Sequence, residues 1–142
     1  VANPLTVPVS AGPFDAIYFS PGIYSHIPGR DRRVRTMARL RDLLTPDGII
    51  VVGPVLAPPL RMLSRARLVD SLRRFGRLAG LPRLAEPGDH FYRGHALDRA
   101  ATAYRFIHHF RTGGEAEAEM AEAGLVVAER LDETCWIVRP RR

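Results

Sequence analysis

The first stretch with residues suited to chemistry is FDAIYFSPGIYSHIPGR, residues 14–30. An apolar run ends there in Ser20-Pro21-Gly22, and Tyr24 and His26 follow. A glycine lets the backbone approach a ligand closely, and an imidazole that titrates near neutrality can move a proton. Both features also have ordinary explanations, because Pro-Gly turns a chain and His26 could cap the next helix or pack on a sheet rim. The stretch is therefore a candidate wall of a site.

The other histidines lie further along the chain. His90 and His95 lie in a polar, irregular stretch, with Asp89 beside His90. No cysteine and no clear third ligand accompany them, so the sequence predicts solvated or substrate-facing roles rather than a metal site. His108 and His109 are adjacent, and on a strand they would point to opposite faces, so only one of them can face a cavity.

A βαβ unit is expected to position the first stretch. The apolar run Phe14 to Phe19 predicts a strand buried on both faces. Apolar residues at helical spacing predict a helix over 30–44 with arginines on its other face, and 45–48 (TPDG) match a type I turn. The run Ile49 to Val52 then predicts a central, parallel strand. Ligands in such sheets sit beyond the carboxyl ends of the strands, which here are Ser20-Pro21-Gly22 and Gly53-Pro54.

The rest of the chain predicts further elements. Residues 1–13 are an extended lead-in, 60–79 a helix, 81–99 irregular chain, and 104–110 a short strand. Thr112 and Glu115 form a capping-box pattern before a helix over 114–123. Its glutamates are expected on a solvated face; they are Glu115, Glu117, Glu119 and Glu122. Two strands over 125–131 and 134–138 are so closely linked that they must be antiparallel. The fold class is α/β, with parallel strands and a C-terminal antiparallel hairpin strand, in one domain.

Composition limits the classes of function that the chain can have. The net charge is +6, but every one of the 21 basic residues is arginine and they are spread along the chain. This is typical of a GC-rich genome rather than of a phosphate-binding patch, so nucleic acid is an unlikely partner. No apolar run approaches the ~18 residues of a membrane span. A single cysteine agrees with a reducing compartment, which predicts a cytoplasmic protein. No G-x-G-x-x-G or Walker-type phosphate loop is present.

The order of segments resembles class I S-adenosylmethionine-dependent methyltransferases. PFDAIYFSPGIYSHIPGRDRRVRTMARLRDLLTPDGIIVVG resembles the family's fourth strand, the following helix and the fifth strand. YRFIHHFRTGGEAEAEMAEAGLVVAER resembles the aromatic-His-x-Phe-Thr segment, its helix and the start of the sixth strand, and TCWIVRP the seventh. The match departs from the pattern at Arg111 and at Leu125, where phenylalanine is usual.

The resemblance implies a partial Rossmann-like sheet. The family's Gly-rich cofactor loop and the acidic residue that holds the ribose would lie before Val1, so the chain is expected to be a C-terminal portion and inactive alone. Phe19, Ser20, Pro21 and Gly22 would bind S-adenosylmethionine. The resemblance also implies a lid over 56–103.

The same resemblance implies roles around a small-molecule acceptor. His26 would be the catalytic base, with His108 as second candidate, and Tyr24, Tyr92 and His95 would contact the substrate. Two other functions stay open: a non-catalytic α/β interaction module, and an arginine-rich nucleic-acid binder. The missing strand would leave 14–19 as an exposed edge, which predicts self-pairing into a homodimer.

Overall fold

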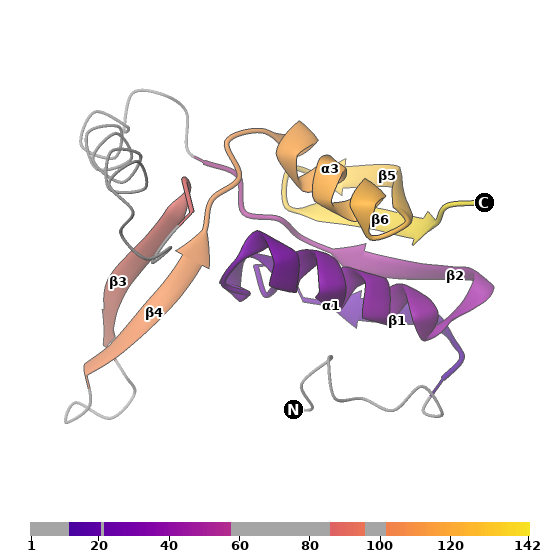
Figure 1. Cartoon of the computed structure of the whole chain (residues 1–142), viewed down its shortest axis with the longest axis horizontal. Helices are drawn as coiled ribbons and strands as arrows, with labels where there is room; N and C mark the ends of the chain where they lie inside the picture. The colour runs from indigo at the N-terminus through magenta and orange to yellow at the C-terminus, as the bar shows by residue number, and fades with distance from the viewer. Residues whose placement is uncertain (1–11, 21, 58–85, 96–101) are drawn as a thin grey trace.

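A computed structural model describes residues 12–20, 22–57, 86–95 and 102–142 (Figure 1). The expected helix over 60–79 and nearly all of the lead-in lie outside these residues. Two sheets are present in the described part of the chain. One has four strands in the order β1-β2-β6-β5, and the other is the two-stranded β3-β4.

The predicted βαβ unit is confirmed. β1 (Phe14–Phe19) leads through the short helix η2 (Tyr24–His26) into α1 (Arg30–Asp42), and β2 (Leu44–Val52) follows. β1 and β2 are parallel, with Phe19 opposite Val52 at their carboxyl ends. The TPDG segment lies within β2 as an irregularity in this pairing, not as a separate turn before the strand.

The C-terminal half is also largely as predicted. α3 (Gly113–Glu122) begins at Thr112, whose side chain accepts a hydrogen bond from the Glu115 amide. β5 (Leu125–Asp132) and β6 (Cys135–Pro140) pair antiparallel, and β6 also pairs antiparallel with β2.

The stretch 81–99 is not wholly irregular. β3 (Asp89–His95) pairs antiparallel with β4 (Thr102–His108), so a hairpin occupies part of the expected lid. Polar residues, Gly94 and two histidines hide this strand in the sequence, because β3 lacks the apolar run that identifies β1. Figure 1 shows the hairpin standing beside the four-stranded sheet.

Within the described residues, the four-stranded sheet is covered on one face only. α1 and α3 contact one another and lie on the same side of the four-stranded sheet (Figure 1). They cover the face that carries Ile50, Val52, Trp136 and Val138, which are all buried. Residues directly opposite in the ladder share a face, so Tyr18 and Val51 belong to the other face. Tyr18 is 69% exposed there.

β1 is therefore an edge strand and not the doubly buried strand that its apolar sequence predicts. Its side chains are mostly exposed, and only Phe19 at its end is buried. Its apolar composition fits a strand with two neighbours and two covered faces. Among the described residues it has one neighbour, β2, and one covered face.

No helix in the described ranges is long and apolar enough to cross a membrane.

Candidate functional site

The carboxyl ends of β1 and β2 are joined by hydrogen bonds. The Gly22 amide donates to the Gly53 carbonyl at 3.0 Å, and the Val55 amide donates to Ser25 Oγ at 2.8 Å. Gly22 has a φ of 84°, a conformation that favours glycine. A Cβ placed on Gly22 would meet only Val55 and His26, at 3.8 and 3.9 Å. The chain therefore turns tightly at Gly22, and no side chain of this residue covers its backbone.

The predicted cofactor-binding residues gather at this corner. Phe19 is buried at the end of β1, and Ser20 is half-buried beside it. Pro21 lies outside the described residues. Their contact with a cofactor stays a prediction.

The two candidate residues of η2 point in different directions. Tyr24 is fully buried, with its hydroxyl donating to Glu119 Oε2 at 2.6 Å and its ring stacked on Phe110 at 5.4 Å. Burial, together with the negative charge of Glu119, raises the pKa of Tyr24 far above its ordinary value, so the phenol stays protonated. A substrate-binding role for Tyr24 stays a prediction, which this position in the core does not favour.

His26 is exposed on the outer side of η2. Its Nδ1 lies 2.6 Å from the Gly22 carbonyl oxygen. A carbonyl only accepts hydrogen bonds, so Nδ1 carries a proton and Nε2 of the neutral ring is left as the basic nitrogen. This geometry is compatible with a base at the mouth of a site.

A buried ion pair lies behind η2. Arg33 on α1 is 1% exposed and reaches Glu119 on α3 through its Nε at 2.9 Å and Nη2 at 2.7 Å. Both residues were expected on solvated helix faces, and for these two the expectation is wrong. The side chains of Glu117 and Glu122 are exposed, as the sequence predicts. Burial lowers the pKa of Arg33, but the hydrogen bonds and charge of Glu119 outweigh it and raise the pKa above its ordinary value.

Glu86 connects this ion pair to the β3-β4 hairpin. Its two carboxylate oxygens accept from Arg33 Nη2 at 3.0 Å and from the Arg30 amide at 2.8 Å. The Arg30 amide belongs to the first turn of α1, where an amide has no partner within the helix. Glu86 therefore caps α1 from a distant part of the chain.

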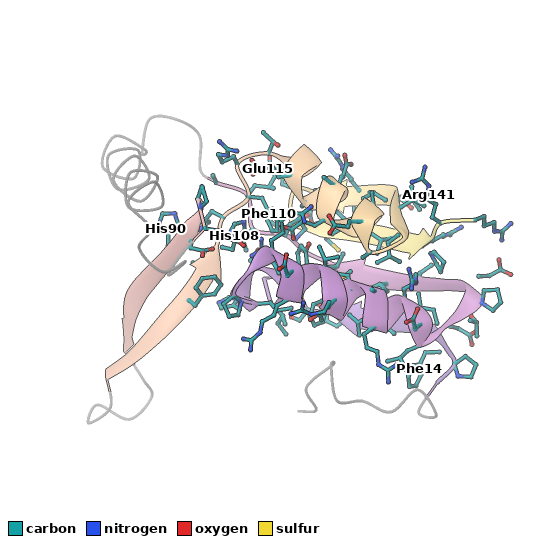
Figure 2. All side chains as sticks on the ribbon, viewed as in Figure 1. Phe14, His90, His108, Phe110, Glu115 and Arg141 are labelled. Carbon is teal, nitrogen blue, oxygen red and sulfur yellow. The ribbon has the colours of Figure 1, made fainter. Side chains whose placement is uncertain are left out.

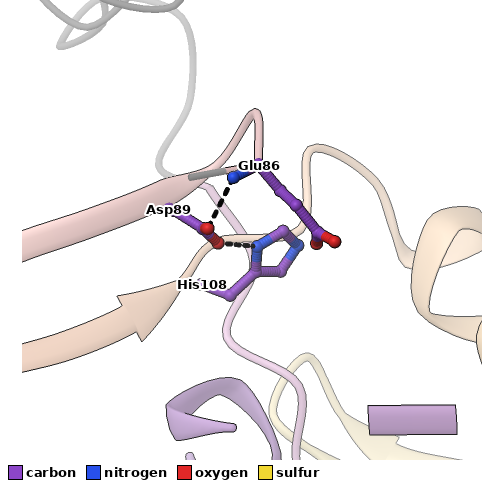
Figure 3. A group of neighbouring side chains, drawn as sticks. All are labelled: Glu86, Asp89 and His108. Carbon is purple, nitrogen blue, oxygen red and sulfur yellow. Dashed lines mark hydrogen bonds and ion pairs between the residues drawn. The ribbon is translucent and has the colours of Figure 1, made fainter. Parts of the chain in front are cut away.

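His108 at the end of β4 forms a second buried pair with Asp89. His108 Nδ1 lies 2.7 Å from Asp89 Oδ1 (Figure 3). Both residues are at most 5% exposed. The other oxygen of Asp89 accepts from the Glu86 amide at 2.6 Å. Burial would raise the pKa of Asp89, but these hydrogen bonds and the charges of His108 and Arg33 lower it below its ordinary value. Asp89 is thus an anion in a buried place.

Phe110 links the two buried pairs. Its ring meets His108 edge-on at 4.7 Å, stacks on Tyr24 and lies 5.3 Å from the Arg33 guanidinium. Its backbone is tied to the segment after β2, through the Val55 carbonyl and the Ala57 amide. Figure 2 shows Phe110 and His108 together where β4 leads toward α3.

Two predicted substrate residues are placed only by their backbone. Tyr92 and His95 lie on β3, opposite Arg105 and Thr102, and their side chains fall outside the described part of the structure. His90 precedes them and packs edge-on against His109. Burial, followed by the charges of His90 and His108, lowers the pKa of His109, so its imidazole is neutral near pH 7.

One group of described residues has metal-ligating atoms close together. One such atom from each of Glu86, Asp89 and His108 lies within 4.8 Å of the other two. Asp89 and Glu86 already accept hydrogen bonds on both of their oxygens. The arrangement is that of a satisfied polar network, in which His108 and Asp89 hold each other in place.

Sequence reasoning missed four members of this site: Arg33, Glu86, Asp89 as a partner of His108, and Glu119. Each is a charged residue in a polar stretch, and its partner lies on another element. The sequence offered one signal for these residues: Arg33 lies on the side of α1 that also carries the buried Met37 and Leu40.

Comparisons with known proteins agree on the fold. No model of a protein family and no curated protein matches the chain. Among solved structures it is similar to the CcbJ methyltransferase from Streptomyces caelestis, with a TM-score of 0.61, 14% identity, and coverage of 100% of this chain and 63% of that one.

Two further structures give the same result. A SAM-dependent methyltransferase from Methanosarcina mazei has a TM-score of 0.59 and 16% identity, with 92% of this chain and 60% of that one covered. A sugar N-methyltransferase from Streptoalloteichus has a TM-score of 0.59 and 13% identity, with 99% and 61% covered. The chain spans about 60% of the length of these enzymes. It has the Rossmann-like α/β fold of class I SAM-dependent methyltransferases over that length, as expected for a C-terminal portion.

Proposed function

We propose that the chain is the C-terminal part of an S-adenosylmethionine-dependent methyltransferase that acts on a small-molecule acceptor. The observation that carries the proposal is the corner at Gly22 and Gly53, where two parallel strands of a methyltransferase-like sheet end side by side. In open α/β sheets this edge is where ligands bind. Phe19, Ser20, Pro21 and Gly22 would form one wall of the cofactor cleft there.

The opposite wall would come from residues outside this chain. The sequence has no Gly-rich cofactor loop, and β1 has an apolar face and an edge that nothing in the described structure covers. A preceding parallel strand with its Gly-rich loop would pair with that edge and bring the loop to Gly22. On this proposal the 142 residues alone neither bind the cofactor nor transfer a methyl group.

The described residues suit the remaining chemistry. S-adenosylmethionine would supply an electrophilic methyl group on sulfur. An acceptor oxygen or nitrogen would displace the sulfur from this methyl carbon, with the electron pair of the broken carbon–sulfur bond left on sulfur, and a base of the protein would take the proton of the acceptor. His26 and His108 are the candidate bases.

The test is cofactor binding by the product of the whole reading frame. We expect Gly22→Val to weaken S-adenosylhomocysteine binding about tenfold or more, because a β-branched side chain is strained at this φ and intrudes on the corner. Val126→Ser, an exposed change on β5, is the matched control and should leave binding unchanged. No binding by the wild-type product, or equal binding by Gly22→Val, would contradict the proposal.

A non-catalytic, self-pairing module is the second candidate. The exposed edge of β1 favours it, because an unpaired apolar strand can add a strand from another copy. A product of the whole reading frame that dimerises and ignores the cofactor would favour this candidate over the first.

A further inference from the structure

A cavity of about 360 Å³, the size of a small-molecule site, is lined by Leu56, Gly113, Arg130, Asp132, Glu133 and Trp136. It lies between the start of α3 and the hairpin of β5 and β6, which α3 contacts (Figure 1). In the sheet, Phe19 is opposite Val52, and Val52 is opposite Trp136. Trp136 is therefore two strands, or about 10 Å, from the end of β1. The cavity is separate from the Gly22 corner.

The edge of the Trp136 ring that carries the N–H group is turned toward this cavity. Trp136 is 1% exposed, and its Nε1 has no hydrogen-bond partner in the described part of the chain. A Cβ placed on Gly113, which lines the cavity, would lie 3.4 Å from Trp136 Cζ2. Cζ2 and Nε1 are bonded to the same ring carbon and share one edge of the indole. Because a buried donor without an acceptor costs free energy, a ligand oxygen that accepts from Nε1 is favoured there.

Arg130 places a second donor beside that edge. Its guanidinium lies 4.8 Å from the centre of the Trp136 ring and pairs with Glu117 on α3. The same Cβ on Gly113 would lie 3.6 Å from Arg130 Nη2. A guanidinium carries five N–H groups, so Arg130 can donate to a ligand and keep its pair with Glu117. Both donors therefore favour an oxygen at the inner end of the cavity.

The link between β5 and β6 gives the exposed side of the cavity the opposite charge. Asp132 and Glu133 line it and are both exposed. The hydrogen bond from the Thr134 amide to Asp132, followed by that from the Thr134 hydroxyl, lowers the pKa of Asp132, so its carboxylate is anionic near pH 7. Together the two carboxylates favour a cation at this side.

We propose that this cavity binds a small polar amine, a molecule whose oxygen accepts from Trp136 Nε1 and whose protonated nitrogen lies beside Asp132 and Glu133. Amino alcohols and amino sugars have this combination of groups. The site does not depend on the proposed methyl transfer, and its ligand need not be the methyl acceptor.

Trp136 is the only tryptophan of the chain, so its fluorescence reports on this cavity. At about pH 6, where a primary amine is protonated, glucosamine should give a saturable change with a Kd of about a millimolar. Glucose lacks the amine and cyclohexylamine lacks the oxygens, so each should bind about tenfold more weakly. No saturable change with glucosamine, or equal affinity for the three compounds, would overturn the proposal.

Two glycine variants test the position of the ligand. Gly113→Val places methyl groups against the edge of Trp136 and should weaken glucosamine binding about tenfold or more. Gly114→Val is the matched control, because a Cβ there would meet only Thr112 Oγ1, at 3.7 Å; it should change the Kd less than about twofold. Urea denaturation shows whether both variants fold. A folded Gly113→Val chain that binds like the wild type would contradict the site.

Glu133→Gln tests the charged side without a change in the core, because Glu133 is exposed. It should reduce the preference for glucosamine over glucose about threefold. Glu129→Gln, an exposed change on β5 at a residue that does not line the cavity, is the matched control and should leave the preference as it is. An unchanged preference in Glu133→Gln would overturn the position assigned to the amine.

Discussion

At the scale of residues, the site is organised by charges that are buried in pairs. Arg33 with Glu119, and His108 with Asp89, each place a charged or titratable group where water is excluded. Removing one partner of such a pair leaves an uncompensated buried charge, which costs more than the pair contributes. Composition and periodicity do not identify these partners, since the sequence separates Arg33 from Glu119 by the whole middle of the chain.

Glu119→Gln is expected to lower the free energy of unfolding by about 3–5 kcal/mol, because Arg33 keeps its buried charge and Tyr24 loses an ionic acceptor. Urea denaturation measures the change. Glu122→Gln is the matched control on the same helix; its exposed pair with Arg30 is screened by solvent, so this change should lower the free energy of unfolding far less. Equal effects of the two variants would contradict a buried ion pair.

Asp89 predicts how stability depends on pH. Its pKa is lowered on folding, so its contribution is present above the unfolded value of about 4 and is lost as the pH falls through the lower folded value. The stability difference between wild type and Asp89→Asn should therefore be largest above about pH 4 and shrink in more acidic solution. Denaturation curves over a pH series test this, and a difference that grows on acidification would be the contrary result.

At the scale of elements, the sequence predicted the helices and strands that have a strong local pattern, but not those that depend on contacts with distant parts of the chain. Apolar runs and periodicity located β1, α1 and the hairpin of β5 and β6, and Thr112 marked the start of α3. β3 was missed because its sequence, DHFYRGH, has no apolar run, and the strand is defined by its backbone pairing with β4. The candidate site was predicted at its glycine corner and at His26 and His108, but not in the carboxylates that surround His108.

The N-cap of α3 can be tested directly. Thr112→Ala should cost about 1 kcal/mol in urea unfolding, since the Glu115 amide loses its side-chain acceptor. Thr112→Ser keeps that acceptor and should recover most of the loss. A serine variant as unstable as the alanine variant would show that the methyl group of Thr112, not its hydroxyl, stabilises the helix start.

At the scale of the whole molecule, the two edges of the four-stranded sheet differ. β5 carries Glu129, Arg130 and Asp132 and has two irregularities in its pairing, features that discourage a further strand. β1 has a single charged residue, Asp15, and exposes Phe14 and Tyr18. Association is therefore expected at β1.

Tyr18→Lys should reduce self-association of the chain, because a lysine on an edge strand opposes pairing with another copy. Sedimentation velocity over a range of concentrations measures the effect. Val126→Lys makes the matched change on β5 and should leave association as it is. If Val126→Lys dissociates the chain and Tyr18→Lys does not, the contact lies at the other edge.

Calorimetric titration with S-adenosylmethionine, of the 142-residue chain and of the product of its whole reading frame, tests the central claim most directly. If the Gly22 corner is one wall of a cofactor cleft whose other wall lies outside this chain, the chain alone shows no measurable heat of binding and the longer product binds one equivalent. Stoichiometric binding by the chain alone, or none by the longer product, would contradict that account.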